Sequence, residues 1–211
     1  MKNVLILGAS GAIAQHAIEQ LKASNDIHLT LFVRSANKLK GNYNSHTTII
    51  EDDALDTNDL SKAIKNQDIV YANLAGEVDK MASKVVKVME EVGTKRLIFV
   101  TSLGIYDEIP GEFGKWNRRM IGSELVRYRK SADIIEKSKI SYTIVRPSWL
   151  TDNDEVEYET TQKGEPFLGT EVARKAVAKY ITSIIIDPQK DVNASVGVNK
   201  PGAYGDKPAF Y

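Results

Sequence analysis

The sequence contains no cysteine and only three histidines, and its charges balance, with 28 Lys and Arg against 28 Asp and Glu. Without cysteine there are no disulfides, no thiolate zinc sites and no cysteine nucleophile. The histidines (His16, His28 and His46) are scattered along the chain, so we predict no metal site. A net charge of zero argues against a dedicated nucleic-acid-binding protein, which is usually clearly basic.

Long apolar runs are also missing. The first run, Val4–Leu7, is followed directly by a glycine, whereas a signal peptide needs ~7–15 apolar residues and a membrane span ~20. We therefore predict a soluble cytoplasmic protein that does not contact a membrane. The length of 211 residues and a hydrophobic content of 42% indicate one folded domain rather than a disordered chain.

Short apolar runs alternate with helical patterns along the chain. The predicted strands are Val4–Leu7, Ile27–Val33, Thr47–Ile50, Asp68–Ala72, Arg96–Val100 and Tyr142–Val145. The predicted helices are Ala12–Ala23, Asn58–Lys65, Val78–Val92, Leu125–Lys137 and Val172–Ile184. Strands rich in Val, Ile and Leu that alternate with helices are typical of a parallel sheet covered by helices on both faces.

Two regions interrupt this alternation. Residues 102–122 contain a proline and several glycines and are predicted to form a long loop, while residues 147–169 are strongly acidic. Both follow the carboxyl ends of predicted strands, where open α/β sheets bind ligands. The fold class is therefore α/β: one Rossmann-type domain over residues 1–211 with a doubly wound parallel sheet. Residues 147–169 and 199–211 are expected to form a small C-terminal cap on the substrate side.

A glycine-containing turn connects the first strand to the first helix. It reads Gly8-Ala9-Ser10-Gly11-Ala12-Ile13-Ala14, a G-x-x-G-x-x-A pattern. Gly8 allows a tight turn, and Gly11 lets the backbone approach a diphosphate without a Cβ in the way. A plain structural turn is the alternative, but the helix N-terminus with its free N–H groups favours a dinucleotide site. The residues predicted to bind the diphosphate are Gly8, Ser10, Gly11, Ala12 and Ile13.

The second strand ends at Arg34-Ser35. NAD sites usually place a carboxylate here to bind the ribose 2′-hydroxyl, whereas an Arg accommodates a 2′-phosphate. A guanidinium binds phosphate bidentately, and a neighbouring hydroxyl adds a donor. We therefore predict NADP rather than NAD as the cofactor, held by Arg34 and Ser35, with Lys38 adding charge if the turn curls back. A solvated Arg at a strand end is the alternative.

Further cofactor contacts are predicted after the third and fourth strands. A carboxylate at Asp53 can accept a hydrogen bond from an adenine amino group, the alternative being that Asp56 or Thr57 caps the next helix. Small residues after the fourth strand, in Asn73-Leu74-Ala75-Gly76, let a ribose pass over the backbone. The residues predicted to bind the cofactor at these two strand ends are Asp53, Ala54, Asn73, Ala75 and Gly76.

In their order along the chain, these segments resemble the short-chain dehydrogenase/reductase superfamily, specifically its atypical, NmrA-like NAD(P)H-binding branch. The matching segments are residues 8–11, 33–34, 52–56, 97–102 and 142–147. The resemblance implies a Rossmann domain with a small C-terminal substrate cap. It also implies a Ser, a Tyr and a Lys around the nicotinamide, and a proline beside it. Ser102 fits this Ser, and Pro147 fits this proline.

The Tyr and Lys depart from the arrangement of that superfamily. Its Y-x-x-x-K motif lies on the helix before the sixth strand, but here Tyr128 has Ala132 four residues on, and Lys130 has Val126 four residues back. Tyr128 and Lys130 are two residues apart, ~200° around a helix, so they cannot both face one ligand. The pair is therefore incomplete in this sequence.

The predicted catalytic residues are Ser102, Tyr106 and Lys130. Tyr106 lies in the loop after Ser102 and substitutes as the acid, while Lys130 holds the ribose hydroxyls, with Arg129 as a rival. The alternative is that Tyr106 and Lys130 are ordinary surface residues beside a basic helix.

The segment 115–130 carries six basic residues against one acid, Glu124. It is either a patch for an anionic substrate or a solvated helix face that pairs with the acidic segment 152–165 of this or a second subunit; we favour the second interpretation. Trp116 and Trp149 flank the predicted pocket, either as an aromatic lid or as ordinary packing under a loop.

Two functions from different classes fit these observations. The first is an NADP(H)-dependent oxidoreductase that reduces a small carbonyl or conjugated substrate. The second is a non-catalytic NADP(H)-binding redox sensor of the NmrA type, which the incomplete Tyr–Lys pair favours. A sugar-nucleotide epimerase needs a larger C-terminal domain than this chain provides. We predict a small-molecule substrate, no nucleic-acid partner and no membrane contact. The sequence is compatible with a monomer or with a homodimer.

Overall fold

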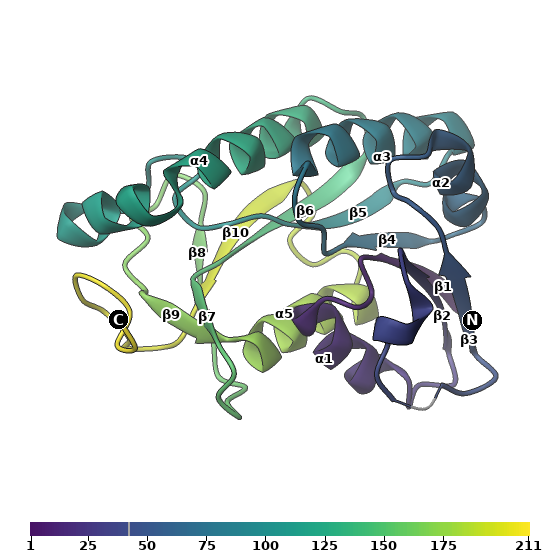
Figure 1. The fold of residues 1–211 in the computed structure, drawn as a ribbon, viewed down its shortest axis with the longest axis horizontal. Coiled ribbons are helices and arrows are strands. Elements are labelled where there is room, and N and C mark those ends of the chain that lie inside the picture. The colour runs from purple at the N-terminus through teal and green to yellow at the C-terminus, as the bar shows by residue number, and fades with distance from the viewer. Residues whose placement is uncertain (42) are drawn as a thin grey trace.

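Eight strands form one mostly parallel sheet in the order β3-β2-β1-β4-β5-β6-β10-β8 (Figure 1). The computed structural model describes residues 1–41 and 43–211. Strands β1 to β6 and β10 run parallel, and β8 pairs antiparallel with β10 at one edge. The strands are β1 (Lys2–Leu7), β2 (Ile27–Val33), β3 (Thr47–Glu51), β4 (Ile69–Ala72), β5 (Arg96–Val100), β6 (Ser141–Pro147), β8 (Glu159–Gln162) and β10 (Ala194–Asn199).

Helices cover both faces of this sheet (Figure 1). Helices α1 (Ala12–Leu21) and α5 (Arg174–Ile186) lie on one face, and α2 (Thr57–Ile64), α3 (Val78–Val92) and α4 (Gly111–Glu136) lie on the other. A short 3-10 turn, η1 (Ala36–Lys38), follows β2. Each face has its own apolar core cluster, as expected when both sides of a parallel sheet are covered. The predicted α/β fold with a doubly wound parallel sheet is confirmed.

Helix positions follow from local sequence. In α1, buried Ile13, Ala14, Ala17, Ile18 and Leu21 form one apolar stripe. The Asp56 carboxylate caps α2 by accepting hydrogen bonds from the N–H groups of Asn58 and Asp59. Helix α3 ends at Gly93, whose φ of 82° is the left-handed conformation that glycine adopts without strain.

The prediction of a loop over residues 102–122 is wrong in its second half. Helix α4 begins at Gly111, directly after Pro110, rather than at Leu125. Its glycines suggested a loop, yet a Cβ on Gly114 would lie 2.1 Å from the Ile109 carbonyl oxygen, so this position needs glycine for close approach. The helix is kinked at Ile121, whose φ of −131° is not helical.

The expected cap over residues 147–169 also differs in part. Its segment β8 joins the main sheet beside β10, and neither strand was predicted. Outside that sheet, β7 (Trp149–Thr151) pairs in parallel with β9 (Glu171–Ala173). The 199–211 segment is connected to this region by a bridge between Gly169 and Tyr204. The C-terminus lies at the end of the molecule opposite the N-terminus (Figure 1).

No helix among the described residues is both long and apolar enough to cross a membrane.

Candidate functional site

A cleft of about 720 Å³ lies at the carboxyl ends of the neighbouring strands β3, β2, β1 and β4. We call it the first cleft. Its lining residues are Gly8, Ser10, Gly11, Phe32, Val33, Arg34, Ser35, Lys38, Asp52, Asp53, Ala54, Asn73, Leu74, Ala75 and Met81. Most of the residues predicted to bind the cofactor are therefore brought together in one place.

Glycine is required in the turn after β1 because Asn73 lies against it. A Cβ on Gly8 would lie 2.2 Å from the Asn73 carbonyl oxygen, and the φ of Gly8 is +75°. A Cβ on Gly11 would lie 2.1 Å from the Asn73 side-chain nitrogen. The two glycines thus let the ends of β1 and β4 approach each other.

The N-terminus of α1 faces this cleft through Gly11. Among the described residues of α1, no side chain caps this end, and none in the first turn is acidic. The first N–H groups of a helix in this state are suited to bind an anion. Ala12 and Ile13 do not line the cleft, and the Ile13 side chain packs in the core, so Ile13 can contact a ligand only through its backbone.

Two cations border the first cleft beside β2. Arg34 and Lys38 are both exposed and line the cleft, because η1 curls the chain back after Ser35. The turn is held by the Ala36 N–H, which donates to the Glu51 carboxylate at 2.7 Å. Neither Arg34 nor Lys38 belongs to an ion pair among the described residues. The cleft therefore presents two cations that form no ion pair among the described residues, and the carboxylates of Asp52 and Asp53 line the same cleft.

The carboxylates after β3 divide into two roles. Asp56 caps α2, as described above, whereas Asp53 and Ala54 line the cleft. One Asp53 oxygen accepts from the Leu55 N–H at 2.9 Å, which fixes the orientation of the carboxylate. The pKa of Asp52 is raised, first by desolvation and then by its proximity to Asp59. Apolar side chains of Phe32, Leu74 and Met81 complete this end of the cleft.

After β4, Asn73 and Ala75 line the first cleft, but Gly76 does not. Gly76 has a φ of +92°, and its carbonyl oxygen accepts a hydrogen bond from Arg127 at 3.4 Å. The positive φ explains why glycine occurs at this position of the turn. Gly76 is therefore not brought together with the other residues predicted to bind the cofactor.

A second cleft, of about 810 Å³, lies at the carboxyl ends of the next strands, β5 and β6. Its lining residues are Thr101, Ser102, Leu103, Ile121, Tyr128, Pro147, Ser148, Trp149, Leu150, Arg174, Phe210 and Tyr211. Since β5 neighbours β4 in the sheet, the second cleft lies beside the first at the same edge. Ser102 and Pro147 thus lie together, at the position that a dinucleotide running from β2 toward β6 would reach.

Tyr128 supplies a second hydroxyl to this cleft. Burial, reinforced by the Glu124 carboxylate, raises the pKa of Tyr128 above its usual value. The phenol therefore stays protonated at neutral pH and is a hydrogen-bond donor rather than a base. The lining includes no lysine, in agreement with the incomplete Tyr–Lys motif of the sequence.

The expectation that Tyr106 lines the same pocket as Ser102 is wrong. The Tyr106 hydroxyl donates to the Glu136 carboxylate at 2.7 Å, near the C-terminal end of α4. Lys163 also donates to Glu136, and its ammonium nitrogen lies 4.4 Å from the Tyr106 ring centroid. Burial raises the pKa of Tyr106. These contacts connect the loop after β5 to α4 and to the segment after β8, away from the second cleft.

Lys130 is likewise separated from Ser102. It is exposed and lies in a groove between α3 and α4 whose other lining includes Asp79, Lys80 and Asp133. The direction of the Lys130 side chain follows from helical geometry, because side chains two residues apart on a helix project about 200° from each other. With Tyr128 facing the second cleft, Lys130 must face away from it. Its rival Arg129 is also placed elsewhere, in an ion pair with Asp133 at 2.8 Å.

Among the described residues of this chain, the basic segment of α4 does not pair with the acidic segment 152–165, while pairing with a second subunit stays a prediction. Lys115 pairs with Glu112, and Arg118 pairs with Asp107. The acidic residues instead contact cations at and near α5: the ion pairs are Asp152–Arg174, Asp154–Lys175 and Glu155–Lys200.

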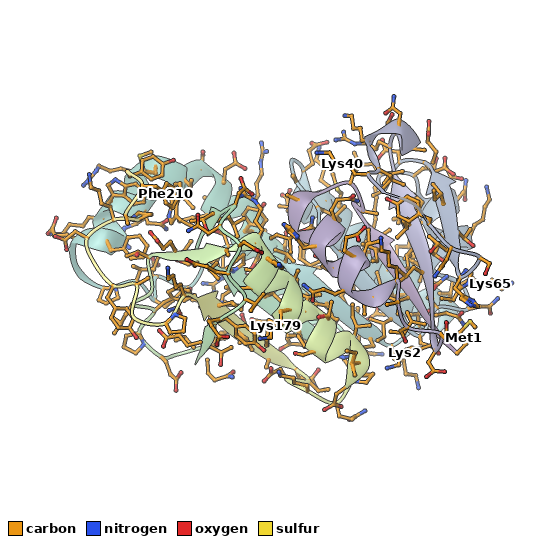
Figure 2. All side chains as sticks on the ribbon, turned by 90° about the horizontal axis from the view of Figure 1, so that it is seen from below. Met1, Lys2, Lys40, Lys65, Lys179 and Phe210 are labelled. Carbon is orange, nitrogen blue, oxygen red and sulfur yellow. The ribbon has the colours of Figure 1, made fainter. Side chains whose placement is uncertain are left out.

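The two tryptophans have different positions. Trp149 lines the second cleft, and its indole N–H donates to the Asn117 side-chain oxygen at 2.9 Å. Trp116 packs behind it, with ring centroids 4.7 Å apart, and Tyr211 contacts both rings. Phe210 lies at the end of the molecule remote from Met1 and Lys65 (Figure 2). One wall of the second cleft is therefore aromatic.

Some lining residues were not predicted from the sequence. Ile121, Leu150, Arg174, Phe210 and Tyr211 come from a helix kink, the β7 strand, the start of α5 and the C-terminal segment. No motif marks these positions, because long-range packing brings them together. Among the described residues, no group of three or more His, Cys, Asp or Glu side chains is arranged to hold a metal ion.

The comparisons with known proteins agree with this geometry. Residues 8–188 match the family described as NAD(P)H-binding. A Rossmann-fold NAD(P)-binding family protein from Shigella flexneri is 46% identical, with a TM-score of 0.87 and 100% of each chain covered. A short-chain dehydrogenase/reductase from Veillonella parvula DSM 2008, in complex with NADP, is 30% identical, with a TM-score of 0.93 and 99% of each chain covered.

Protein YmjC of Escherichia coli K12 is 54% identical over 43 residues, which are 20% of this chain and 72% of YmjC.

The glycine turn after β1, the continuous edge of strand ends and these similarities lead to one assignment. The chain belongs to the NAD(P)H-binding family of Rossmann-fold proteins, within the atypical short-chain dehydrogenases/reductases.

Proposed function

We propose that the protein is an NADP(H)-dependent oxidoreductase that reduces a small carbonyl or conjugated substrate. The observation that supports this most directly is that the two clefts lie at the carboxyl ends of neighbouring strands, β1, β4, β5 and β6. The first cleft has the glycine turn and the uncapped helix end that a diphosphate needs. The hydroxyl-bearing residues that line the second cleft include Ser102 and Tyr128, which we assign to the predicted nicotinamide position.

The preference for NADP rests on Arg34, Ser35 and Lys38. Two exposed cations without ion-pair partners among the described residues favour a dianionic 2′-phosphate over a neutral 2′-hydroxyl. The Asp53 carboxylate, which lines the same cleft, would accept a hydrogen bond from an adenine amino group.

In the proposed reaction, a bound reduced nicotinamide supplies a hydride to the substrate. Ser102 donates a hydrogen bond to the substrate oxygen and stabilises the negative charge that develops there. Tyr128, which burial keeps protonated, donates a second hydrogen bond or the proton itself. The aromatic wall around Trp149 borders this region on one side.

A second candidate, a redox sensor of the NmrA type, is favoured by one observation: no lysine lines the second cleft to lower the pKa of Tyr128. The test is a screen of aldehydes, ketones and quinones for NADPH oxidation by the purified protein, with Ser102→Ala as the control. Turnover that falls in the variant supports the oxidoreductase. NADPH binding without turnover of any of these classes would support the sensor.

A further inference from the structure

Arg174 is the one charged side chain among the described residues that line the second cleft. It is the first residue of α5 and follows β9, so both elements fix its backbone. The other lining side chains are apolar, aromatic or hydroxyl-bearing. A single cation in such surroundings marks one place where an anionic group is favoured.

The present partner of Arg174 lies outside the cleft. Arg174 Nη1 donates to Asp152 Oδ1 at 2.8 Å, but Asp152 does not line the cleft. The side chain of Asp152 is 84% exposed, against 25% for Arg174. Because the Asp152 carboxylate lies largely in solvent, its attraction to Arg174 is screened by water and salt, and it is readily exchanged for another anion. A guanidinium has five N–H donors, and the hydrogen bonds of the described residues use only Nη1.

The walls near Arg174 suit a flat apolar group. The rings of Trp149 and Tyr211 meet edge to face, with centroids 5.2 Å apart, and both line the cleft. Trp149 is held in place by Asn117 and by Trp116 behind it. Aromatic walls of this kind bind planar hydrocarbon or aromatic bodies with little loss of side-chain freedom.

We infer that the substrate is a carboxylate with a flat apolar body, and that Arg174 binds this carboxylate in exchange for Asp152. The inference rests on the proposed function, and it adds the substrate class. The substrate's reducible group would then lie toward Ser102 and Tyr128, at the strand ends, with the acid group toward α5. The basic residues of α4 do not fill this role, because none of them lines the second cleft.

Binding can be measured without a known substrate. The probes are 2-naphthoate and its neutral analogue 2-naphthamide, titrated calorimetrically into the protein with and without saturating NADP⁺. We expect naphthoate to bind about tenfold to a hundredfold more tightly, the range for one charge-assisted contact. Arg174→Gln should remove this preference and leave naphthamide affinity within about twofold.

The matched control is Lys175→Ala. Lys175 is the next residue of α5 and pairs with Asp154 of the same acidic segment, but it does not line the cleft. This variant should retain the preference for naphthoate. Asp152→Asn frees the guanidinium and should increase naphthoate affinity several-fold. Should Arg174→Gln fail to fold, Arg174→Lys keeps the charge and loses the planar fork, and it should show an intermediate preference.

Equal affinities for naphthoate and naphthamide in the natural protein would overturn the inference, as would equal losses in the Arg174 and Lys175 variants. Failure of NADP⁺ to bind contradicts the proposed function instead, and the titrations without NADP⁺ still compare the two probes. Once an aldehyde is turned over, 4-carboxybenzaldehyde should have a lower KM than 4-carbamoylbenzaldehyde. Arg174→Gln should abolish that difference with little change in kcat.

Discussion

The fully buried guanidinium of Arg146, on β6, pairs with the buried Glu108 carboxylate in the loop after β5. The same carboxylate accepts from the N–H groups of Gly104 at 2.9 Å and Tyr106 at 2.8 Å. Arg146 also donates to the Ser195 hydroxyl and to backbone carbonyls, so its charge is well satisfied. This pair therefore fixes the shape of the loop that begins at Ser102, on the floor of the second cleft.

Glu108→Ala should destabilise the protein strongly. Removal of one partner of a buried pair leaves the other charge uncompensated, and this typically costs ~3–5 kcal/mol of unfolding free energy. Urea denaturation measures the difference. Lys115→Ala is the control, because it breaks an exposed pair with Glu112 and should cost at most ~1 kcal/mol. Similar midpoints for the two variants would show that the Arg146–Glu108 pair does not stabilise the loop.

The parts of the site that the sequence predicted are those set by local geometry. The turn at Gly8 and Gly11 follows directly from a strand and precedes a helix, so its pattern is complete within seven residues. The residues after β2, β3 and β4 were located by the same logic, since the carboxyl ends of parallel strands share one edge. The parallel strands β1, β2, β4, β5 and β6 were recognisable because most of their residues are buried, whereas no residue of the edge strand β3 is fully buried.

The parts that the sequence did not predict depend on long-range packing. Distance along the chain placed Tyr106 near Ser102, but its hydroxyl reaches Glu136 instead. The start of α4 was not predicted because Gly114 was interpreted as a loop residue. In the structure, glycine is needed there because the helix lies against the Ile109 carbonyl oxygen. Strand β8 is polar and pairs only with β10, far along the chain. Arg174 carries no motif at all, and only the fold places it in the second cleft.

We expect Arg34→Ala to raise the Kd for NADPH by about tenfold to a hundredfold, because one charge-assisted phosphate contact contributes ~1.5–3 kcal/mol of binding free energy. NADH, which lacks the 2′-phosphate, should bind the variant and the natural protein with nearly equal affinity. Fluorescence titration of both cofactors measures this. Lys40→Ala is the control, because Lys40 lies outside the first cleft and should leave both affinities unchanged. Equal affinity of the natural protein for NADPH and NADH would contradict the proposed role of Arg34.

Alanine at the two turn glycines should have different consequences. Gly8→Ala places a Cβ against the backbone of Asn73 at a positive φ, so it should lower the stability by ~1–3 kcal/mol or more. The Cβ of Gly11→Ala meets the end of the Asn73 side chain at 2.1 Å, which can rotate, and the Gly8 carbonyl oxygen at 3.2 Å, which has to move by only a few tenths of an ångström. That variant should therefore fold with a nearly normal Tm but bind NADPH poorly. Thermal unfolding and cofactor titration separate the two effects, and normal NADPH affinity in Gly11→Ala would place the diphosphate elsewhere.

The final prediction separates the hydroxyls that face the second cleft from the one that does not. Ser102→Ala and Tyr128→Phe should each lower turnover by about 10²–10³, the usual loss for one well-placed donor, with NADPH affinity within a few-fold. Tyr106→Phe should leave turnover within about twofold, because its hydroxyl contacts Glu136, outside the cleft.

The pH dependence gives a second, independent readout for Tyr128. Its pKa is raised by burial and by Glu124, so the proton-donating form persists from neutral pH to about pH 10 and is lost only as the pH rises through the raised value. Turnover should therefore show no decline due to this residue over that range, and the basic limb should disappear in Tyr128→Phe. A basic limb near neutrality that survives in Tyr128→Phe would assign the proton to another group.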